Sequence, residues 1–195
     1  MLRLIGFYDY TVILTYASLI AAVLGMFFSA DGAVTAAVLC LMISGICDAF
    51  DGTVARSKKN RTAEEKAFGI QIDSLCDAVS FGVHPAVLCY HLGMDGIPGM
   101  VILCLFALCA VIRLGFFNVM EEQRQKTEGG CNKTYRGLPV TTISILLPVF
   151  YLTRSFLPVG LFLALLHVLM AVTAFLFVLD FSVKKLDVSK VFVKK

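Results

Sequence analysis

Six apolar runs, each close to the length that crosses a lipid bilayer, dominate this sequence. A bilayer core needs roughly 20 consecutive apolar residues in a helix, because lipid offers exposed backbone groups no hydrogen-bond partner. With 58% hydrophobic and 16% charged residues, the chain is too apolar for an ordinary soluble domain. We therefore predict an all-α polytopic membrane protein, a single domain over residues 1–195. The six expected transmembrane helices are Thr11–Phe28, Ala33–Ala55, Phe68–Leu92, Ile97–Val119, Leu138–Thr153 and Leu157–Phe181.

The basic residues lie almost entirely on one side of this arrangement. If successive spans alternate in direction, 15 of the 17 Lys and Arg residues fall in the N-terminus, the predicted loops 56–67 and 119–137, and the C-terminal tail. Loops rich in Lys and Arg mark the cytoplasmic side of a membrane. We therefore expect both termini in the cytoplasm of a multi-pass protein of the cell membrane. The net charge of +3 is explained by this bias and by attraction to anionic lipid, not by a nucleic-acid partner.

Four aspartates interrupt the apolar runs near the cytoplasmic ends of the second and third spans: Asp48, Asp51, Asp73 and Asp77. Asp48 and Asp51 share one helix face, and Asp73 and Asp77 share another, because residues three or four apart are neighbours on a helix. Asp48 and Asp77 each lie about 12–14 Å from the expected end of their helix at 1.5 Å per residue. Since the two helices run antiparallel, the two pairs should meet at a similar depth.

A cluster of four carboxylates predicts a metal site, because like charges repel strongly unless cations neutralise them. Hard divalent cations with oxygen ligands are the natural choice, so we expect two ions of Mg²⁺ or Mn²⁺. Asp48, Asp51, Asp73 and Asp77 are their candidate ligands. A divalent-cation transporter is a remote alternative, since it would need a polar path across the membrane, and the outer halves of the spans lack ionisable residues.

Small residues lie beside the acids. Gly52 and Ala55 share the face of Asp48 and Asp51, and Gly69 comes one turn before Asp73. Such residues serve close helix packing in membranes, but here they also leave room for a flat ligand against the backbone. Two cations with Arg56 nearby suit a pyrophosphate, whose oxygens metals hold during an in-line displacement at phosphorus.

The combined pattern is Asp48-x-x-Asp51-Gly52-x-x-Ala55-Arg56, followed by Gly69-x-x-x-Asp73-x-x-x-Asp77. It resembles the signature of the CDP-alcohol phosphatidyltransferase family. The segment between Arg56 and Gly69 is about one helical turn longer than is usual in that family. The extra residues fall in the polar stretch "SKKNRTAEEKA" and should lengthen the cytoplasmic loop without moving either carboxylate pair.

Three further stretches, "FGIQIDSLCDAVSFGVHPA", "RLGFFNV" and "YRGLPVTT", are similar to those of the integral-membrane phosphatidylserine synthases within this family. The resemblance implies transfer of the phosphatidyl group from CDP-diacylglycerol to the hydroxyl of L-serine, with release of CMP. It also implies an active site that faces the cytoplasm, two divalent cations and a homodimer. A sister enzyme that uses glycerol-3-phosphate or inositol phosphate as acceptor is the nearer alternative.

The resemblance assigns roles to residues of the motif. Asp77 is expected to be the general base for the attacking hydroxyl, in addition to binding metal. A base is needed because a serine hydroxyl is a poor nucleophile on its own. The CDP-lipid pocket is expected to be lined by Asp48, Gly52, Ala55, Arg56 and Gly69.

Candidates for binding the acceptor or its phosphate come from outside the motif. Arg113 is the only basic residue deep in a span, so it should face the cavity, an ion pair with an aspartate being the alternative. Lys133 and Arg136 precede the fifth span. Asn118 and Ser80 are weaker polar candidates that helix packing would equally explain. His84, seven residues after Asp77 and just before a proline expected to kink the helix, is a minor candidate.

Overall fold

The computed structural model describes residues 6–8, 10–58, 62–127 and 134–184, with the backbone alone at 55–57, 124–127, 134–136 and 182–184. The seven α-helices in the described residues are α1 (Ile13–Ala30), α2 (Val34–Ser57), α3 (Ala63–Asp77), α4 (His84–His91), α5 (Ile97–Thr127), α6 (Ile143–Tyr151) and α7 (Val159–Val178). A π-helical segment, Ala78–Val83, joins α3 to α4, and short 3-10 turns cover Tyr10–Val12, Val140–Thr142 and Leu152–Ser155.

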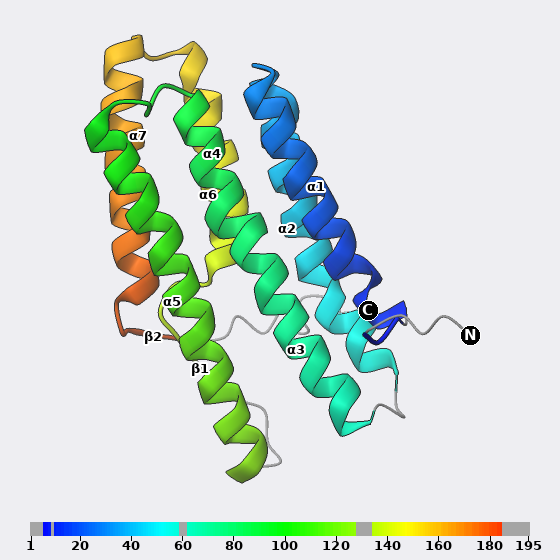
Figure 1. Ribbon diagram of the computed structural model, residues 1–195. Helices are drawn as coiled ribbons and strands as arrows, with labels where there is room; N and C mark the ends of the chain where they lie inside the picture. Colours follow the sequence, from blue (N-terminus) through cyan, green and yellow to red (C-terminus); the bar gives the residue numbers. More distant parts are fainter. Residues whose placement is uncertain (1–5, 9, 59–61, 128–133, 185–195) are drawn as a thin grey trace, which may run out of the picture.

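The helices form one upright bundle. Figure 1 shows α1 and α2 side by side at one edge and α7 at the other, with α3, the π segment and α4 running on as a single rod between them. The only strands in the described residues, β1 (Thr134–Arg136) and β2 (Ser182–Lys184), pair antiparallel as a small ribbon. This ribbon is a minor addition to the expected all-α fold.

Five helical segments are long and apolar enough to cross a membrane: Tyr10–Ala30, Val34–Val54, Ala63–His91, Ile97–Gln123 and Val159–Val178. They identify a multi-pass membrane protein. The remaining predicted span, Leu138–Thr153, corresponds to a shorter apolar segment, Val140–Ser155, which contains Pro148 and changes from α to 3-10 winding after Tyr151. The expected count of six membrane-crossing helices is therefore not confirmed.

The start of α3 was predicted wrongly. The sequence suggested a loop as far as residue 67, but the helix begins at Ala63. Thr62 accepts a hydrogen bond from the Glu65 backbone at 3.1 Å, and the Glu65 side chain accepts one from the Thr62 backbone at 3.0 Å. This reciprocal capping box satisfies donors that would otherwise be lost at a helix start. Residues 63–67, which were expected to belong to the loop before Phe68, are therefore helical.

The end of α5 was also predicted too early. The helix does not stop near Val119 but continues to Thr127. The added residues "MEEQRQKT" are mostly Met, Glu, Gln, Arg and Lys, all good helix formers that need no apolar partner. α5 therefore extends as a polar helix past the end of its apolar part.

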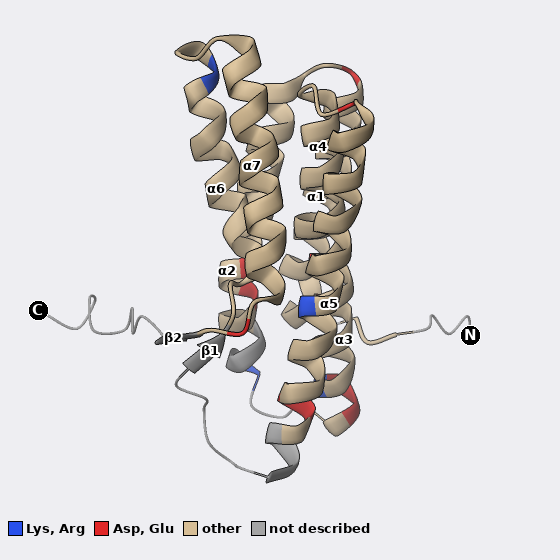
Figure 2. Ribbon diagram, turned by 90° about the vertical axis from the view of Figure 1, so that its left-hand side faces the viewer, with Lys and Arg blue, Asp and Glu red and all other residues tan. Residues whose placement is uncertain are grey.

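The inward face of α1 consists of small residues. Those buried are Thr15, Ser18, Ala21, Ala22, Gly25 and Ser29, whereas large residues such as Ile20 and Phe27 are exposed on the opposite face. Small residues let helix backbones approach closely in a membrane, where packing rather than water drives association. α1 consequently packs along α2. The end of the bundle at which α2 ends and α3 begins is here called the carboxylate end, and α1 starts near this end (Figure 1). Figure 2 shows that charged residues gather towards this end.

Candidate active site

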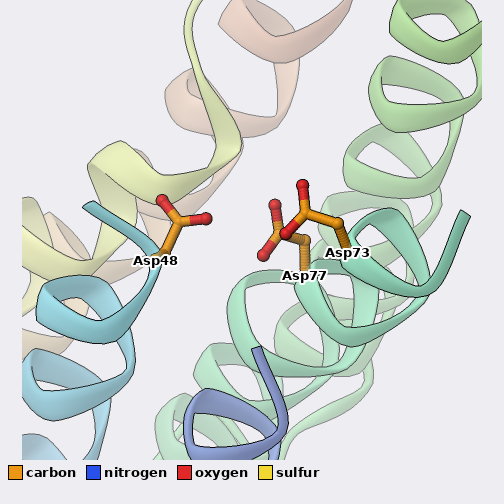
Figure 3. Close-up of side chains that lie close together, drawn as sticks. All are labelled: Asp48, Asp73 and Asp77. Atoms are coloured by element: carbon orange, nitrogen blue, oxygen red, sulfur yellow. The ribbon is translucent and has the colours of Figure 1, made fainter. Parts of the chain in front are cut away.

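Three aspartates converge between α2 and α3. Oxygen atoms of Asp48, Asp73 and Asp77 all lie within 4.8 Å of one another. Figure 3 shows Asp48 projecting from α2 towards Asp73 and Asp77 on α3. Asp77 is the most enclosed of the three, with 9% of its surface exposed, and the other two are half-buried. The expectation that acids from the two helices meet at one depth is confirmed for these three.

Asp51 lies at the edge of this group. Its side chain interacts directly with that of Asp73, as Asp48 does with Asp77, but it does not belong to the cluster of three. Instead, Oδ2 of Asp51 accepts a hydrogen bond of 3.2 Å from Oγ1 of Thr15 on α1. Asp51 is therefore adjacent to the cluster of three and is tied to a third helix.

Two cavities flank the carboxylates. The smaller, about 130 Å³, is lined by Asp51 and Asp73 together with Thr15, Gly52, Lys66 and Gly69. The larger, about 360 Å³, is lined by Asp48, Asp73 and Asp77 together with Arg113, Phe117 and Thr141. Asp73 borders both cavities. A ligand in one cavity and a ligand in the other would thus meet at the carboxylates.

The donor set suits hard divalent cations. Mg²⁺ binds oxygen at about 2.1 Å, so two ligands of one ion lie up to about 4.2 Å apart. The spacing of the three carboxylates needs only a slight contraction to reach this range. No His or Cys of the described residues belongs to the group, which argues against a zinc site. The residues therefore fit the expected metal.

Arg113 reaches the site from α5. It is 9% exposed, and its guanidinium carbon lies 5.9 Å from the centre of the Phe117 ring. Besides the larger cavity it lines a further cavity of about 230 Å³ with Gly137 and Phe177. Gly137 has a φ of +73°, and a Cβ there would lie 3.4 Å from Nε of Arg113. Arg113 thus faces a cavity, as expected, and the glycine keeps the backbone close to it.

The sequence of this chain matches a known protein family. The model of the CDP-alcohol phosphatidyltransferase family matches residues 10–182, nearly the whole of the described structure. The chain belongs to this family. The carboxylates that meet between α2 and α3 belong to the motif that resembles the family's signature, which makes this region the candidate active site.

Several curated phosphatidyltransferases are similar to the chain. Archaetidylserine synthase of Methanothermobacter thermautotrophicus is 36% identical over 131 residues, covering 67% of this chain and 52% of that protein. CDP-diacylglycerol–serine O-phosphatidyltransferase of Saccharomyces cerevisiae is 38% identical over 129 residues, 62% of this chain and 45% of that protein. The enzyme of the same name from Helicobacter pylori is 31% identical over 134 residues, 68% of this chain and 52% of that protein. The chain spans about half the length of these relatives. No solved structure matches it.

The other residues of the phosphatidyltransferase signature occupy the smaller cavity or lie below it. Gly52 and Gly69 line that cavity together, from α2 and α3. Ala55 and Arg56 lie in the last turn of α2, where the structure describes the backbone alone. The described side chains of the motif are thus divided between the two cavities, with Asp51, Gly52 and Gly69 at the smaller, Asp48 and Asp77 at the larger, and Asp73 at both.

The candidates proposed for the acceptor side are not all brought to the site. Asn118 accepts a hydrogen bond of 2.8 Å from Ser74, and the buried Ser80 accepts one of 3.4 Å from Ser18, so both connect helices. Arg136 lies in β1, where only the backbone is described, and Lys133 lies outside the described residues. His84 is fully buried against Gly25 on α1 and lines none of the cavities around the acids. Arg113 is the acceptor-side candidate that the structure brings to the carboxylates.

Sequence reasoning missed Thr15, Lys66 and Thr141, all of which line the two cavities. A signal for Thr15 existed: Thr11, Thr15 and Ser18 recur on one face of an otherwise apolar helix. Lys66 was assigned to a loop, although it lies one turn before Gly69 on the same face of α3. No local pattern marks Thr141, which lies in the 3-10 turn Val140–Thr142 and reaches the cavity because that turn packs against α2, α5 and the π segment.

Proposed function

We propose that this protein transfers the phosphatidyl group of CDP-diacylglycerol to the hydroxyl of L-serine, giving phosphatidylserine and CMP. The observation that carries the proposal is that the carboxylates line two neighbouring cavities, with Asp73 bordering both. A transferase of this kind needs two substrates to approach one phosphorus atom from different directions. The names of the three relatives support serine as the acceptor.

The smaller cavity suits the nucleotide half of the donor. Gly52 and Gly69 leave their backbones open on two facing helices, which gives a flat base or ribose a place to lie. The family resemblance assigns Ala55 and Arg56, in the last turn of α2, to the same CDP-lipid pocket. It also assigns Asp48 there, which lines the larger cavity beside it. The pyrophosphate would then lie beside the carboxylates.

The larger cavity suits the acceptor. The carboxylate of serine requires a cation, and Arg113 supplies one in a setting of Phe117 and Thr141, where its charge is weakly screened. Asp77 lies in the same cavity and is the most enclosed of the acids. Serine held by Arg113 would present its hydroxyl to Asp77.

The chemistry follows from these positions. Asp48, Asp51, Asp73 and Asp77 would hold two divalent cations, Mg²⁺ or Mn²⁺, which when bound supply positive charge to the phosphoryl oxygens. Asp77 takes the proton from the serine hydroxyl as its oxygen bonds to the phosphorus of the phosphatidyl group. The bond from that phosphorus to the bridging oxygen breaks, and the electron pair leaves with CMP. Arg113 keeps the acceptor oriented throughout.

We further propose the membrane topology. Taking Val140–Ser155 as a sixth, short span places both termini and the carboxylate end in the cytoplasm, on the side that holds 15 of the 17 Lys and Arg residues. Serine and CMP are water-soluble and would then exchange with the cytoplasm, while the lipid product stays in the membrane. We expect the active protein to be a homodimer.

The deciding experiment is an acceptor panel. Protein purified in detergent is incubated with CDP-diacylglycerol and Mg²⁺ or Mn²⁺, and CMP release is measured with L-serine, glycerol-3-phosphate, inositol phosphate and inositol as acceptors. Serine-dependent release with little response to the phosphorylated acceptors is expected. Release that depends on glycerol-3-phosphate or inositol phosphate instead would replace serine synthesis with the sister reaction.

A further inference from the structure

α1 carries none of the family's signature residues and no charged residue, yet it contacts the site. Thr15, which is 5% exposed, donates its hydroxyl hydrogen to Asp51 on α2 at 3.2 Å. It also lines the smaller cavity next to Asp51 and Gly52. A helix that would otherwise serve only as packing thus holds one of the four carboxylates.

The hydroxyl of Thr15 bonds to a carboxylate on another helix, unlike the buried hydroxyls of Thr173 and Ser29. In a membrane helix such a group normally bonds to a carbonyl of its own helix. Thr173 on α7 does so with Leu169 at 2.7 Å, and Ser29 on α1 does so with Gly25 at 2.8 Å. Thr15 instead reaches across to a carboxylate 36 positions away in the sequence. The hydroxyl of Thr15 is therefore oriented towards Asp51 and not towards a carbonyl of α1.

A second set of bonds fixes Thr15 against α2. One turn further along α1, Ser18 donates to the Ser44 carbonyl at 3.3 Å, and Ser44 donates back to the Ser18 carbonyl at 2.9 Å. Ser18 also lies 3.4 Å from Ser80 in the π segment that follows Asp77. These contacts join α1 to both helices that bear the acids. Thr15 cannot slide relative to Asp51 without breaking them.

We propose that Thr15 is a positioning residue, which holds the Asp51 carboxylate on the side of the smaller cavity so that it serves a second cation apart from the group of Asp48, Asp73 and Asp77. The proposal rests on the metal dependence in the proposed function. Without this bond, Asp51 could turn towards the other three acids or into the cavity. Four carboxylates would then compete for one ion instead of offering two adjacent sites. The rest of the site would keep its fold, because Ser18 and Ser44 still hold α1 in place.

The test measures Mn²⁺ binding to the purified protein by electron paramagnetic resonance of the free ion, without any substrate. Thr15→Val removes the hydroxyl and keeps the shape, and Thr15→Ser keeps the hydroxyl. Thr173→Val is the matched control, because it makes the same change at a similarly buried threonine that lines neither cavity beside the acids. Loss of the partner that orients a metal ligand typically weakens metal affinity by about 10-fold or more. We expect that loss in one of two classes of Mn²⁺ site in Thr15→Val, and in neither class in Thr15→Ser or Thr173→Val.

A double-mutant cycle with Asp51→Asn separates positioning from general damage. If Thr15 acts through Asp51, Thr15→Val should change Mn²⁺ binding little once Asp51 is already Asn. Equal binding by Thr15→Val and the unmodified protein overturns the inference, as does an equal loss in Thr15→Ser or in Thr173→Val. If Thr15→Val does not fold, Thr15→Ala replaces it in the same cycle. Failure of the unmodified protein to bind Mn²⁺ would instead refute the metal dependence itself.

Discussion

Ser74 on α3 donates a hydrogen bond of 2.8 Å to the side-chain oxygen of Asn118 on α5. Ser74 follows Asp73 directly and lines the larger cavity, and Asn118 lies five residues after Arg113. The bond therefore joins the helix that bears two of the acids to the helix that bears the candidate acceptor-binding arginine.

This bond predicts equal effects for Ser74→Ala and Asn118→Ala. Either change removes a link worth about 1 kcal/mol, and the double variant should be no worse than each single one. The measurement is the melting temperature together with the KM for serine and for CDP-diacylglycerol. A rise in the KM for serine in Asn118→Ala alone would show that Asn118 contacts the acceptor.

Chelation should stop the reaction. If the four aspartates bind divalent cations, EDTA abolishes CMP release and added Mg²⁺ or Mn²⁺ restores it, because the carboxylates and the pyrophosphate repel each other without them. NaCl at matched ionic strength is the control, because it raises the ionic strength without supplying a divalent cation. Full activity in chelator would refute the metal site.

Asp73 and Asp77 should differ although they share a helix face. Asn keeps the shape of Asp and one acceptor oxygen but removes its charge and basicity. Asp77→Asn should lower kcat by about 10²-fold or more, a typical contribution of a general base, with little effect on CDP-diacylglycerol binding. Asp73→Asn should weaken Mn²⁺ binding and recover partly at high Mn²⁺. Rescue of Asp77→Asn by excess metal to near the original rate would make Asp77 a metal ligand only.

Arg113 should affect the acceptor more than the donor. It lines the larger cavity, whereas Gly52 and Gly69 line the smaller one. Arg113→Ala is expected to raise the KM for serine by at least about 10-fold, the loss expected for a charge-assisted pair in a weakly solvated site. Arg113→Lys should recover part of this. A selective rise in the KM for CDP-diacylglycerol would assign Arg113 to the lipid phosphates.

Gly25 should not tolerate a side chain. A Cβ at this position would overlap the imidazole of His84, which is fully buried and so has no room to move. Gly25→Ala is expected to destabilise the protein by about 1–3 kcal/mol through overpacking. His84→Ala in the same chain should restore the melting temperature. Gly115→Ala is the matched control, because a Cβ there meets nothing within 4 Å. Equal melting temperatures for Gly25→Ala and Gly115→Ala would contradict the prediction.

The convergence of the aspartates could be predicted because helix geometry is local: spacing fixes a shared face, and the depth below each helix end fixes the height. The start of α3 was predictable too, since Thr62 and Glu65 stand at the spacing of a capping box, but the apolar run was given more weight. The bonds from Thr15 to Asp51 and from Ser74 to Asn118 were not predictable. Each depends on how two helices are rotated against each other, which no single helix encodes.

The cap of α3 has a consequence for protein engineering. Glu65 accepts hydrogen bonds from both the Thr62 backbone and the Lys58 side chain, the latter at 3.1 Å. These two bonds fix where α3 begins and join its first turn to the residue that follows α2. We therefore expect the positions of Asp73 and Asp77, about two and three turns after Glu65, not to depend on the length of chain between Lys58 and Thr62. A fluorescent reporter or an affinity handle inserted there is expected to leave the carboxylates of α3 in register with those of α2.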